Sequence, residues 1–224
     1  KLKVPMVDEH YYQTPGWFIN NQDFYDSYDR SKSKVYLGEY AAHVPKRRMN
    51  IQTALTEALY LTSIERNGDV VSMTSFAPLL AKRGHTQWNP DLIYFTNTDI
   101  LLTVDYYVQA LYGNNAGETY IPSQVTLSDN NKKVKQRVAS SVVKDTKTGD
   151  LILKLVNVLP VEVNSSINIK NFNVENSEAI LTVLKGQPND EKQIPVTSKI
   201  KLSNILKYQL PAYSFSVIRI KVNK

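Results

Sequence analysis

Apolar and polar residues alternate in blocks along the first half of the chain, and each block has the period of a strand or a helix. Apolar runs at 3–7, 34–42 and 70–76 predict three strands. Residues 50–66 and 103–112 place their apolar side chains at helical spacing, and residues 23–30 suit a shorter helix. Strands and helices in strict alternation predict a parallel sheet, either part of an α/β barrel or an open doubly wound sheet.

The pattern changes at Ile121, beyond which short β-rich runs are separated by turn residues. We predict strands over 134–143, 151–159, 167–172, 179–184, 199–202 and 213–222. Strands without intervening helices are typical of an antiparallel β-sandwich. We therefore expect an α/β plus all-β chain, with one domain at 1–118 and a second, β-sandwich domain at 119–224.

The composition excludes several classes of function but does not identify one. The chain lacks cysteine, so disulfides and thiolate metal sites are excluded. The net charge of +6 comes entirely from residues 121–224, where the basic residues are scattered. A nucleic-acid partner would require a basic stripe with interleaved aromatic residues or a known module. Neither is visible, so we expect no nucleic-acid partner. No run is long and apolar enough to predict a membrane span, so we expect no membrane partner, and the compartment stays open.

Several common active-site patterns are also missing. No glycine-rich loop follows a predicted strand, the histidines lack metal-ligand spacing, and no serine stands in a nucleophile elbow. We therefore predict no cofactor. Carboxylates, a histidine and many aromatic residues at strand ends remain, and this combination suits a sugar: aromatic rings pack on its C–H faces while polar groups hold its hydroxyls.

Glu39 is the strongest catalytic candidate. It follows Gly38 at the end of the predicted strand in 34–42, where the chemistry of α/β folds collects. The glycine lets another group approach the backbone closely. An equally weighted alternative is that Glu39 caps the loop or pairs with one of the nearby cations Lys46, Arg47 and Arg48.

Several strings occur together in an order that resembles the α-L-arabinofuranosidases of glycoside hydrolase family 51. They are VDEHYY at 7–12, PGWF at 15–18, YDSYDR at 25–30, VYLGEYA at 35–41, VSMTSFAPL at 71–79, WNPDLIYF at 88–95, YYVQ at 106–109 and LPAYSFSVI at 210–218. The resemblance implies a (β/α)₈ TIM barrel followed by a jelly-roll-like β-sandwich, with residues 1–118 covering about strands six to eight of the barrel. It also implies retaining removal of terminal arabinofuranosyl groups from arabinan or arabinoxylan.

The same resemblance assigns roles to individual residues. It makes Glu39 the nucleophile, and His10 and Tyr12 the pair that positions the nucleophile and the sugar. Asp91 falls near a polar sugar contact of the family. Trp17 and Trp88 could wall the pocket, although core packing is the simpler use of either ring.

One element of the family pattern is missing. A retaining glycosidase requires a second carboxyl group as acid/base, which the family carries in an Asn-Glu pair. No such pair ends a strand in residues 1–90, and Glu175-Asn176 is reversed and lies in the predicted sandwich. We therefore expect a C-terminal portion of the enzyme that is inactive alone and associates with another copy or with the missing N-terminal part.

Two other interpretations stay open. Asp8 or Glu9 could replace the acid/base, which would make the chain a minimal hydrolase. Alternatively, the sandwich could bind carbohydrate or a protein partner beside an inert barrel remnant. The simpler role of the sandwich is to pack against the barrel and stabilise it.

Overall fold

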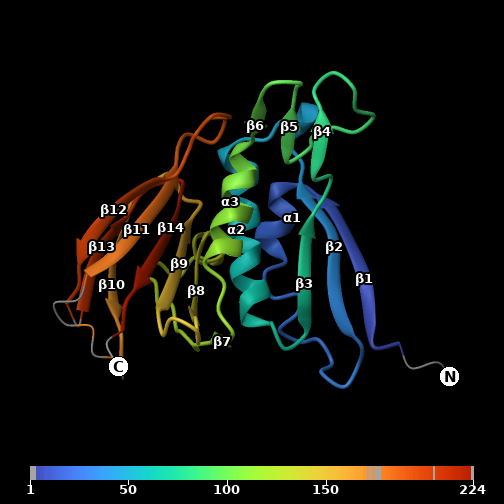
Figure 1. The fold of residues 1–224 in the computed structure, drawn as a ribbon. Coiled ribbons are helices and arrows are strands. Elements are labelled where there is room, and N and C mark those ends of the chain that lie inside the picture. The colour runs from blue at the N-terminus through green and yellow to red at the C-terminus, as the bar shows by residue number, and fades with distance from the viewer. Residues whose placement is uncertain (1–3, 171, 173, 175–177, 204, 223–224) are drawn as a thin grey trace.

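The computed structural model describes residues 4–170, 172, 174, 178–203 and 205–222. In this part of the chain, three parallel strands form a sheet in the order β1-β2-β3, and three helices pack between that sheet and a β-sandwich (Figure 1). The strands are β1 (Met6–Gln13), β2 (Lys34–Ala42) and β3 (Val71–Phe76), and the helices are α1 (Pro15–Asn20), α2 (Ile51–Arg66) and α3 (Val104–Asn114). The opposite face of the sheet carries no described helix or strand.

Helix α2 is the centre of the molecule. Asn50 caps its first turn in a capping box with Thr53, which satisfies amide groups that the helix itself leaves free. Leu55 and Leu59 are fully buried, and so are the polar residues Thr56 and Glu57, because α2 is enclosed by helices, sheet and sandwich. The sequence pattern predicted this helix correctly, and Asn67 caps its end.

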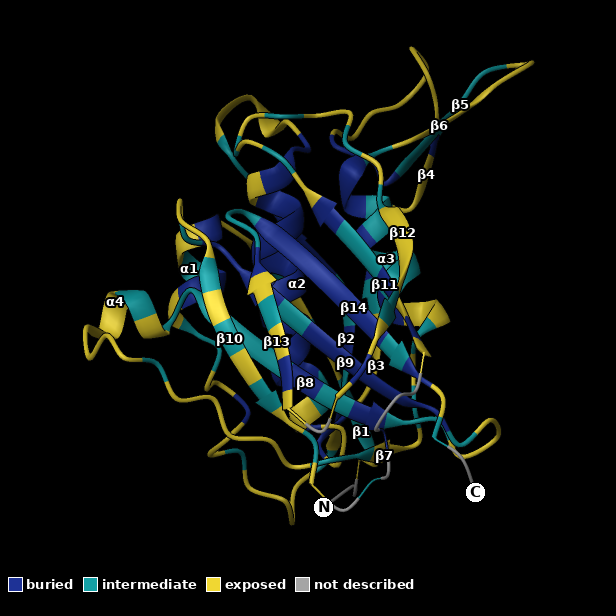
Figure 2. Cartoon of the chain, turned by 90° about the vertical axis from the view of Figure 1, so that its left-hand side faces the viewer, coloured by how far each residue is buried: buried dark blue, intermediate teal, exposed yellow. Residues whose placement is uncertain are grey.

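The second half forms the predicted antiparallel sandwich. A six-stranded sheet in the order β12-β11-β14-β9-β8-β7 packs on a two-stranded sheet of β10 and β13 within the described residues. Exposed and less exposed positions alternate along β10, as expected of an outer strand (Figure 2). The bounds are β7 (Thr119–Tyr120), β8 (Val138–Lys144), β9 (Leu151–Asn157), β10 (Val163–Asn168), β11 (Glu178–Lys185), β12 (Val196–Lys201), β13 (Ile205–Leu210) and β14 (Ser214–Ile220), with a short helix α4 (Lys132–Lys135) before β8.

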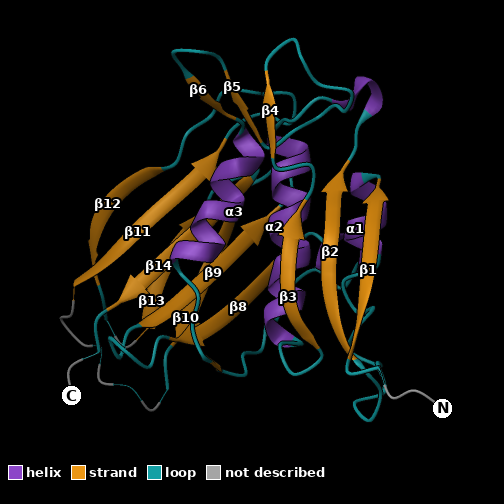
Figure 3. Cartoon of the chain, turned by 45° about the vertical axis from the view of Figure 1, so that its right-hand side comes forward, coloured by secondary structure: helices purple, strands orange, loops and turns teal. Residues whose placement is uncertain are grey.

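A small sheet stands beyond the carboxyl ends of the parallel strands (Figure 3). It comprises β4 (Leu80–Lys82), β5 (Ile93–Phe95) and β6 (Ile100–Leu102), and a 3₁₀ turn at Pro45–Arg47 follows β2. Leu92, just before β5, packs with Ala41, Met49 and Phe76, so this sheet is anchored to the ends of β2 and β3.

Several elements differ from the prediction. The strand predicted at 134–143 begins only at Val138, after the short helix α4, and the strand predicted at 167–172 lies at Val163–Asn168. Residues 23–30 form turns, and the helix precedes them at Pro15–Asn20, where Thr14 caps the first turn and Pro15 suits it. Strand β1 runs through Gln13 instead of ending at Val7, and the start of the predicted run, Lys3, lies outside the described residues. Strand β13 was missed, although Leu206, Tyr208 and Leu210 alternate with polar or exposed neighbours.

The barrel prediction is only partly matched. The parallel strands form an open three-stranded sheet in the described residues, and no closed (β/α)₈ barrel is present. The predicted boundary at 118/119 stays a prediction.

Candidate active site

Strands β1 and β2 bring two polar side chains, those of His10 and Tyr12, to the carboxylate of Glu39. His10 is paired with Glu39 in the strand register, directly after an irregularity at Glu9/His10. The Tyr12 hydroxyl donates a hydrogen bond of 2.6 Å to Glu39 Oε2. His10 Nδ1 lies 3.5 Å from the same oxygen. The structure therefore groups three of the four predicted site residues around one carboxylate oxygen.

Asp8 extends this group. Its Oδ2 lies 3.1 Å from His10 Nε2, so each ring nitrogen of His10 faces a carboxylate. The Asp8 carboxyl group occupies space that a Cβ on residue 38 would need, and Gly38 provides it. Alternation along β1 places Asp8, His10 and Tyr12 on one face, a period-2 signal that could have identified Asp8 from the sequence.

Tyr12 is held by its hydroxyl group and by one face of its ring. Burial raises its pKa, and the hydrogen bond to Glu39 raises it further, so the phenol remains a neutral donor near neutral pH. His43 stacks on Tyr12 with ring centroids 5.5 Å apart and planes inclined by 21°. Burial and the nearby Arg47 lower the pKa of His43, which favours a neutral imidazole in this stack. Sequence reasoning missed His43, because no spacing rule links it to Tyr12.

The alternative pairing of Glu39 with a downstream cation is wrong. Arg47 donates a hydrogen bond to the Asn89 carbonyl, and Arg48 pairs with Glu191 in the loop before β12. Within the described residues, the only basic side chain within 4 Å of the Glu39 carboxylate is that of His10.

Glu9 points away from Glu39. Its carboxylate accepts hydrogen bonds from Tyr11 and from Tyr25, the latter at 2.6 Å. Tyr25 is fully buried and Tyr11 packs against the helical core, so Glu9 belongs to the helix-covered side of β1. Of the two substitute acids considered, only Asp8 shares the face of Glu39.

Asp91 stands apart from the Glu39 group. Its Oδ2 accepts a weak hydrogen bond of 3.4 Å from Thr86, and its backbone N–H donates to the Tyr94 hydroxyl at 2.9 Å. The residue is buried, and burial raises the pKa of its carboxyl group. None of these described contacts joins it to His10, Tyr12 or Glu39.

The two tryptophans behave differently. Trp17 packs on Tyr11, Phe18 and Tyr60 and belongs to the core, as the simpler interpretation predicted. Trp88 is 65% exposed in the loop before β5. Its ring is therefore free to meet a ligand or another part of a larger protein.

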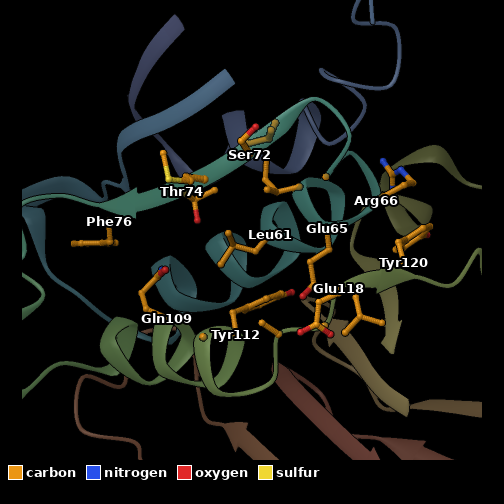
Figure 4. Close-up of a pocket in the computed structure, with 18 of the residues that line it drawn as sticks. Leu61, Glu65, Arg66, Ser72, Thr74, Phe76, Gln109, Tyr112, Glu118 and Tyr120 are labelled. Carbon is orange, nitrogen blue, oxygen red and sulfur yellow. The ribbon is translucent and has the colours of Figure 1, made fainter. Parts of the chain in front are cut away.

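A groove of about 880 Å³ lies beside β3, between that strand and helices α2 and α3 (Figure 4). Ser72, Thr74 and Phe76 of β3 form one wall, and Leu61 of α2 and Tyr112 of α3 form the other. None of the four predicted site residues lines it. The groove is the space next to the unpaired edge of β3.

Two other kinds of site are absent from the described part of the chain. No cluster of three or more His, Asp or Glu side chains is arranged to hold a metal ion. No described helix has the length and apolarity needed to cross a membrane.

Comparison with known proteins gives the family. The α-L-arabinofuranosidase C-terminal domain family matches residues 25–214. An extracellular exo-α-L-arabinofuranosidase of Streptomyces chartreusis is 48% identical over 126 residues, covering 56% of this chain and 15% of that protein. Alpha-L-arabinofuranosidase A of Aspergillus kawachii is 34% identical over 223 residues, covering 95% of this chain and 33% of that protein.

Solved structures agree with this result. The arabinose-bound α-L-arabinofuranosidase MgGH51 superposes with a TM-score of 0.89 at 28% identity, covering 98% of this chain and 37% of that one. The α-L-arabinofuranosidase of Thermotoga maritima shares the fold, with a TM-score of 0.77 at 14% identity over 97% of this chain and 53% of that one. The chain thus spans about a third of the full-length Aspergillus relative that it matches. It belongs to the α-L-arabinofuranosidases of family 51, of which it is a C-terminal portion.

Proposed function

We propose that Glu39 is the nucleophile of a retaining α-L-arabinofuranosidase, and that this chain carries it without the acid/base. The observation that supports this most is the convergence of Tyr12 and His10 on Oε2 of Glu39. The hydrogen bond from Tyr12 and the nearby His10 ring both lie at Oε2, and no described residue donates a hydrogen bond to Oε1. A held carboxylate with one free oxygen suits attack on an anomeric carbon.

In the proposed reaction, a Glu39 oxygen bonds to the anomeric carbon as the bond to the leaving-group oxygen breaks. A general acid gives that oxygen its proton, and a covalent arabinosyl ester remains on Glu39. Water, deprotonated by the same acid/base, then attacks the ester and releases arabinose. His10 and Tyr12 keep Glu39 aligned through both steps.

The second carboxyl group has to stand roughly 5 Å from the nucleophile in a retaining enzyme. Glu9 is engaged with tyrosines on the other face, and Asp8 is engaged with His10. Glu175 lies outside the described residues. We propose that an upstream part of the parent protein supplies the acid/base, so the chain alone does not hydrolyse arabinosides.

The open sheet supports the same proposal. Parallel sheets are normally covered on both faces, yet one face of β1-β2-β3 is uncovered and the β3 edge is unpaired in the described chain. We propose that residues 1–118 provide about strands six to eight of a (β/α)₈ barrel and that 119–224 form the sandwich. The rest of the barrel would pair with β3 and fill the groove beside it. Without that part, a second copy of the chain would pair with β3 instead.

We also propose a role for Asp91 and a class of substrate. Asp91 would contact the sugar once the upstream part completes the pocket. The substrates would be terminal arabinofuranosyl groups on arabinan or arabinoxylan. The sandwich packs on α2, and Phe215 of β14 stacks on Tyr112 of α3, which favours a stabilising role for residues 119–224.

Hydrolysis of a nitrophenyl α-L-arabinofuranoside tests the proposal. We expect no turnover by the 224-residue chain and full turnover by the parent protein. In the parent, Glu39→Ala should reduce kcat by about 10⁴-fold, by analogy with loss of a catalytic nucleophile. Azide should restore turnover of Glu39→Ala by forming an arabinosyl azide.

Glu9→Gln is the matched control, because Glu9 is a neighbouring acid on the other face of β1. Its kcat should stay within about threefold of the unmodified parent. Full activity of the isolated chain would contradict the missing acid/base. Azide rescue of Glu9→Ala but not of Glu39→Ala would contradict the assignment of the nucleophile.

A further inference from the structure

Two acidic side chains are sealed in the core between α2 and α3. Glu57 and Asp105 are both fully buried, and the hydrogen bonds between the two helices place them side by side. Thr53, one turn before Glu57 on α2, donates to Asp105, and Gln109, one turn after Asp105 on α3, donates to Glu57. No lysine, arginine or histidine among the described residues lies within 4 Å of either group. Asp105 Oδ1 is buried without a hydrogen-bond partner. The proposed hydrolytic reaction makes no use of these groups.

The pair is bound to the end of the strand that carries Glu39. The Ala42 backbone N–H donates to Glu57 Oε1 at 2.9 Å, and the Gln109 amide donates to Glu57 Oε2 at 3.2 Å. The Tyr40 hydroxyl donates to Gln109 Oε1 at 2.6 Å. Tyr40 and Ala42 are the first and third residues after Glu39, so this network ties the strand end to two helices.

Two adjacent carboxylates cannot both be ionised in such a site, since burial and mutual repulsion both oppose the second charge. The remaining groups that face the pair are the Thr53 hydroxyl, which donates to Asp105 Oδ2 at 3.2 Å, and the Tyr40 phenol. Neither carries a positive charge. A proton between the carboxyl groups replaces their repulsion with a hydrogen bond and gives Asp105 Oδ1 a role.

The surroundings shift the pKa of both carboxyl groups upward. Burial, and then the charge of Asp105, raises the pKa of Glu57 well above its usual range. Burial raises the pKa of Asp105 to about 7. Because the two groups interact, the proton belongs to the pair and not to one residue.

We propose that Glu57 and Asp105 hold one shared proton in the core, and that this protonated pair fixes the end of β2 to α2 and α3. Glu57 is thereby a positioning residue for Glu39, and this consequence rests on the proposed function. The shared proton does not depend on the proposed function.

Infrared spectroscopy of the 224-residue chain tests the proton directly. The carbonyl stretch of a protonated carboxylic acid is separate from that of a carboxylate, and exposed acids are ionised at about pH 7. We expect a protonated-acid band at that pH, lost in the double variant Glu57→Gln/Asp105→Asn and retained in Glu178→Gln, an exposed control. Absence of the band in the unmodified chain, or its survival in the double variant, would overturn the proposal.

Unfolding by urea provides a second measurement that needs no enzyme activity. The folded state binds protons at this site more tightly than the unfolded state, so the site's contribution to stability falls as pH rises from about 5 to about 8. The midpoint of the unmodified chain should therefore fall more over this range than that of the double variant. Equal falls in the two proteins would contradict a shared proton.

Hydrogen exchange and kinetics test the positioning role. The Ala42 amide should remain protected in Glu57→Gln, which keeps an acceptor, and exchange faster in Glu57→Leu. In the parent enzyme, Glu57→Leu should lower kcat more than it changes KM, and Glu57→Gln should restore kcat. Equal Ala42 exchange in both variants would reject the link to β2. A normal kcat in Glu57→Leu would reject only the positioning of Glu39, since the band and the urea midpoints do not depend on hydrolysis.

Discussion

The carboxyl group of Asp8 lies against the backbone of Gly38, in the space that a side chain at position 38 would fill. This contact joins the neighbouring strands β1 and β2 immediately before Glu39. Asp8 also faces His10 Nε2 at 3.1 Å, and His10 in turn faces Glu39. Because Gly38 has no Cβ, the Asp8 carboxylate can lie beside the proposed nucleophile, Glu39.

Replacing Gly38 by alanine should displace Asp8 and weaken this arrangement. We expect Gly38→Ala to destabilise the chain by about 1–3 kcal/mol, as crowding of a packed site does, measured by urea unfolding. Gly113→Ala is the matched control, because nothing lies within 4 Å of a Cβ there and the residue is inside α3. That variant should gain up to about 1 kcal/mol. Equal stability of the two variants would contradict the crowding.

Loss of the Tyr12 hydroxyl should slow the proposed reaction. In the parent enzyme, Tyr12→Phe removes a 2.6 Å hydrogen bond to Glu39, and hydrogen bonds to charged groups contribute about 1.5–3 kcal/mol. We expect kcat to fall by about 10- to 100-fold with little change in KM. Tyr36→Phe, which loses a hydroxyl contact with Ser75 instead, should keep kcat within about threefold. Equal losses in both variants would rule out a specific role for Tyr12.

The helices and the sandwich are joined by a buried ion pair. Lys154 Nζ of β9 lies 2.6 Å from Glu65 of α2 and donates to the Asn115 carbonyl at 2.7 Å. Burial lowers the pKa of Lys154, while the Glu65 carboxylate opposes that shift. Lys154→Met should cost about 3–5 kcal/mol of unfolding free energy, because it leaves Glu65 without its cation.

The control for this ion pair is Lys199→Met on β12. Lys199 and Glu178 are both more than half exposed, so their pair should contribute less than about 1 kcal/mol. Urea unfolding of both variants measures the difference. A loss at Lys154 no larger than that at Lys199 would mean that the buried pair does not hold the sandwich to the helices.

Asp145 should make the sandwich sensitive to acid. Backbone hydrogen bonds from Thr148, with help from Arg219, lower the pKa of Asp145 to about 2. A lowered pKa stabilises the fold above the unfolded value of about 4, and this stabilisation is lost as pH falls towards 2. The thermal midpoint of Asp145→Asn should therefore change less between about pH 5 and pH 2 than that of the unmodified chain. The exposed control Glu178→Gln should behave like the unmodified chain.

Local patterns predicted the helices at α2 and α3 and most strands, because their periods follow from which face is buried. The prediction was wrong at residues 23–30, where the spacing of the aromatic residues suited a helix. These residues form turns instead, in which Tyr25 donates a hydrogen bond to Glu9 and both Tyr25 and Tyr28 pack against the core. Strand ends were also misjudged. His10 and Tyr12 lie inside β1, since polar residues can continue a strand when one of its faces is open.

The sequence by itself identified the family and selected Glu39 as the candidate nucleophile of a glycosidase. Both depend on uncommon strings and residue types, which are local properties of the chain. Only the tertiary structure decided which groups surround that acid. Strand register places Asp8 near Glu39, and ring stacking places His43 against Tyr12. Glu9 points to the other face of β1, and Asp91 makes its contacts elsewhere. The pairing of Glu57 with Asp105 likewise depends on how two helices pack. Contacts between residues far apart in sequence arise from packing of whole elements, which no local pattern encodes.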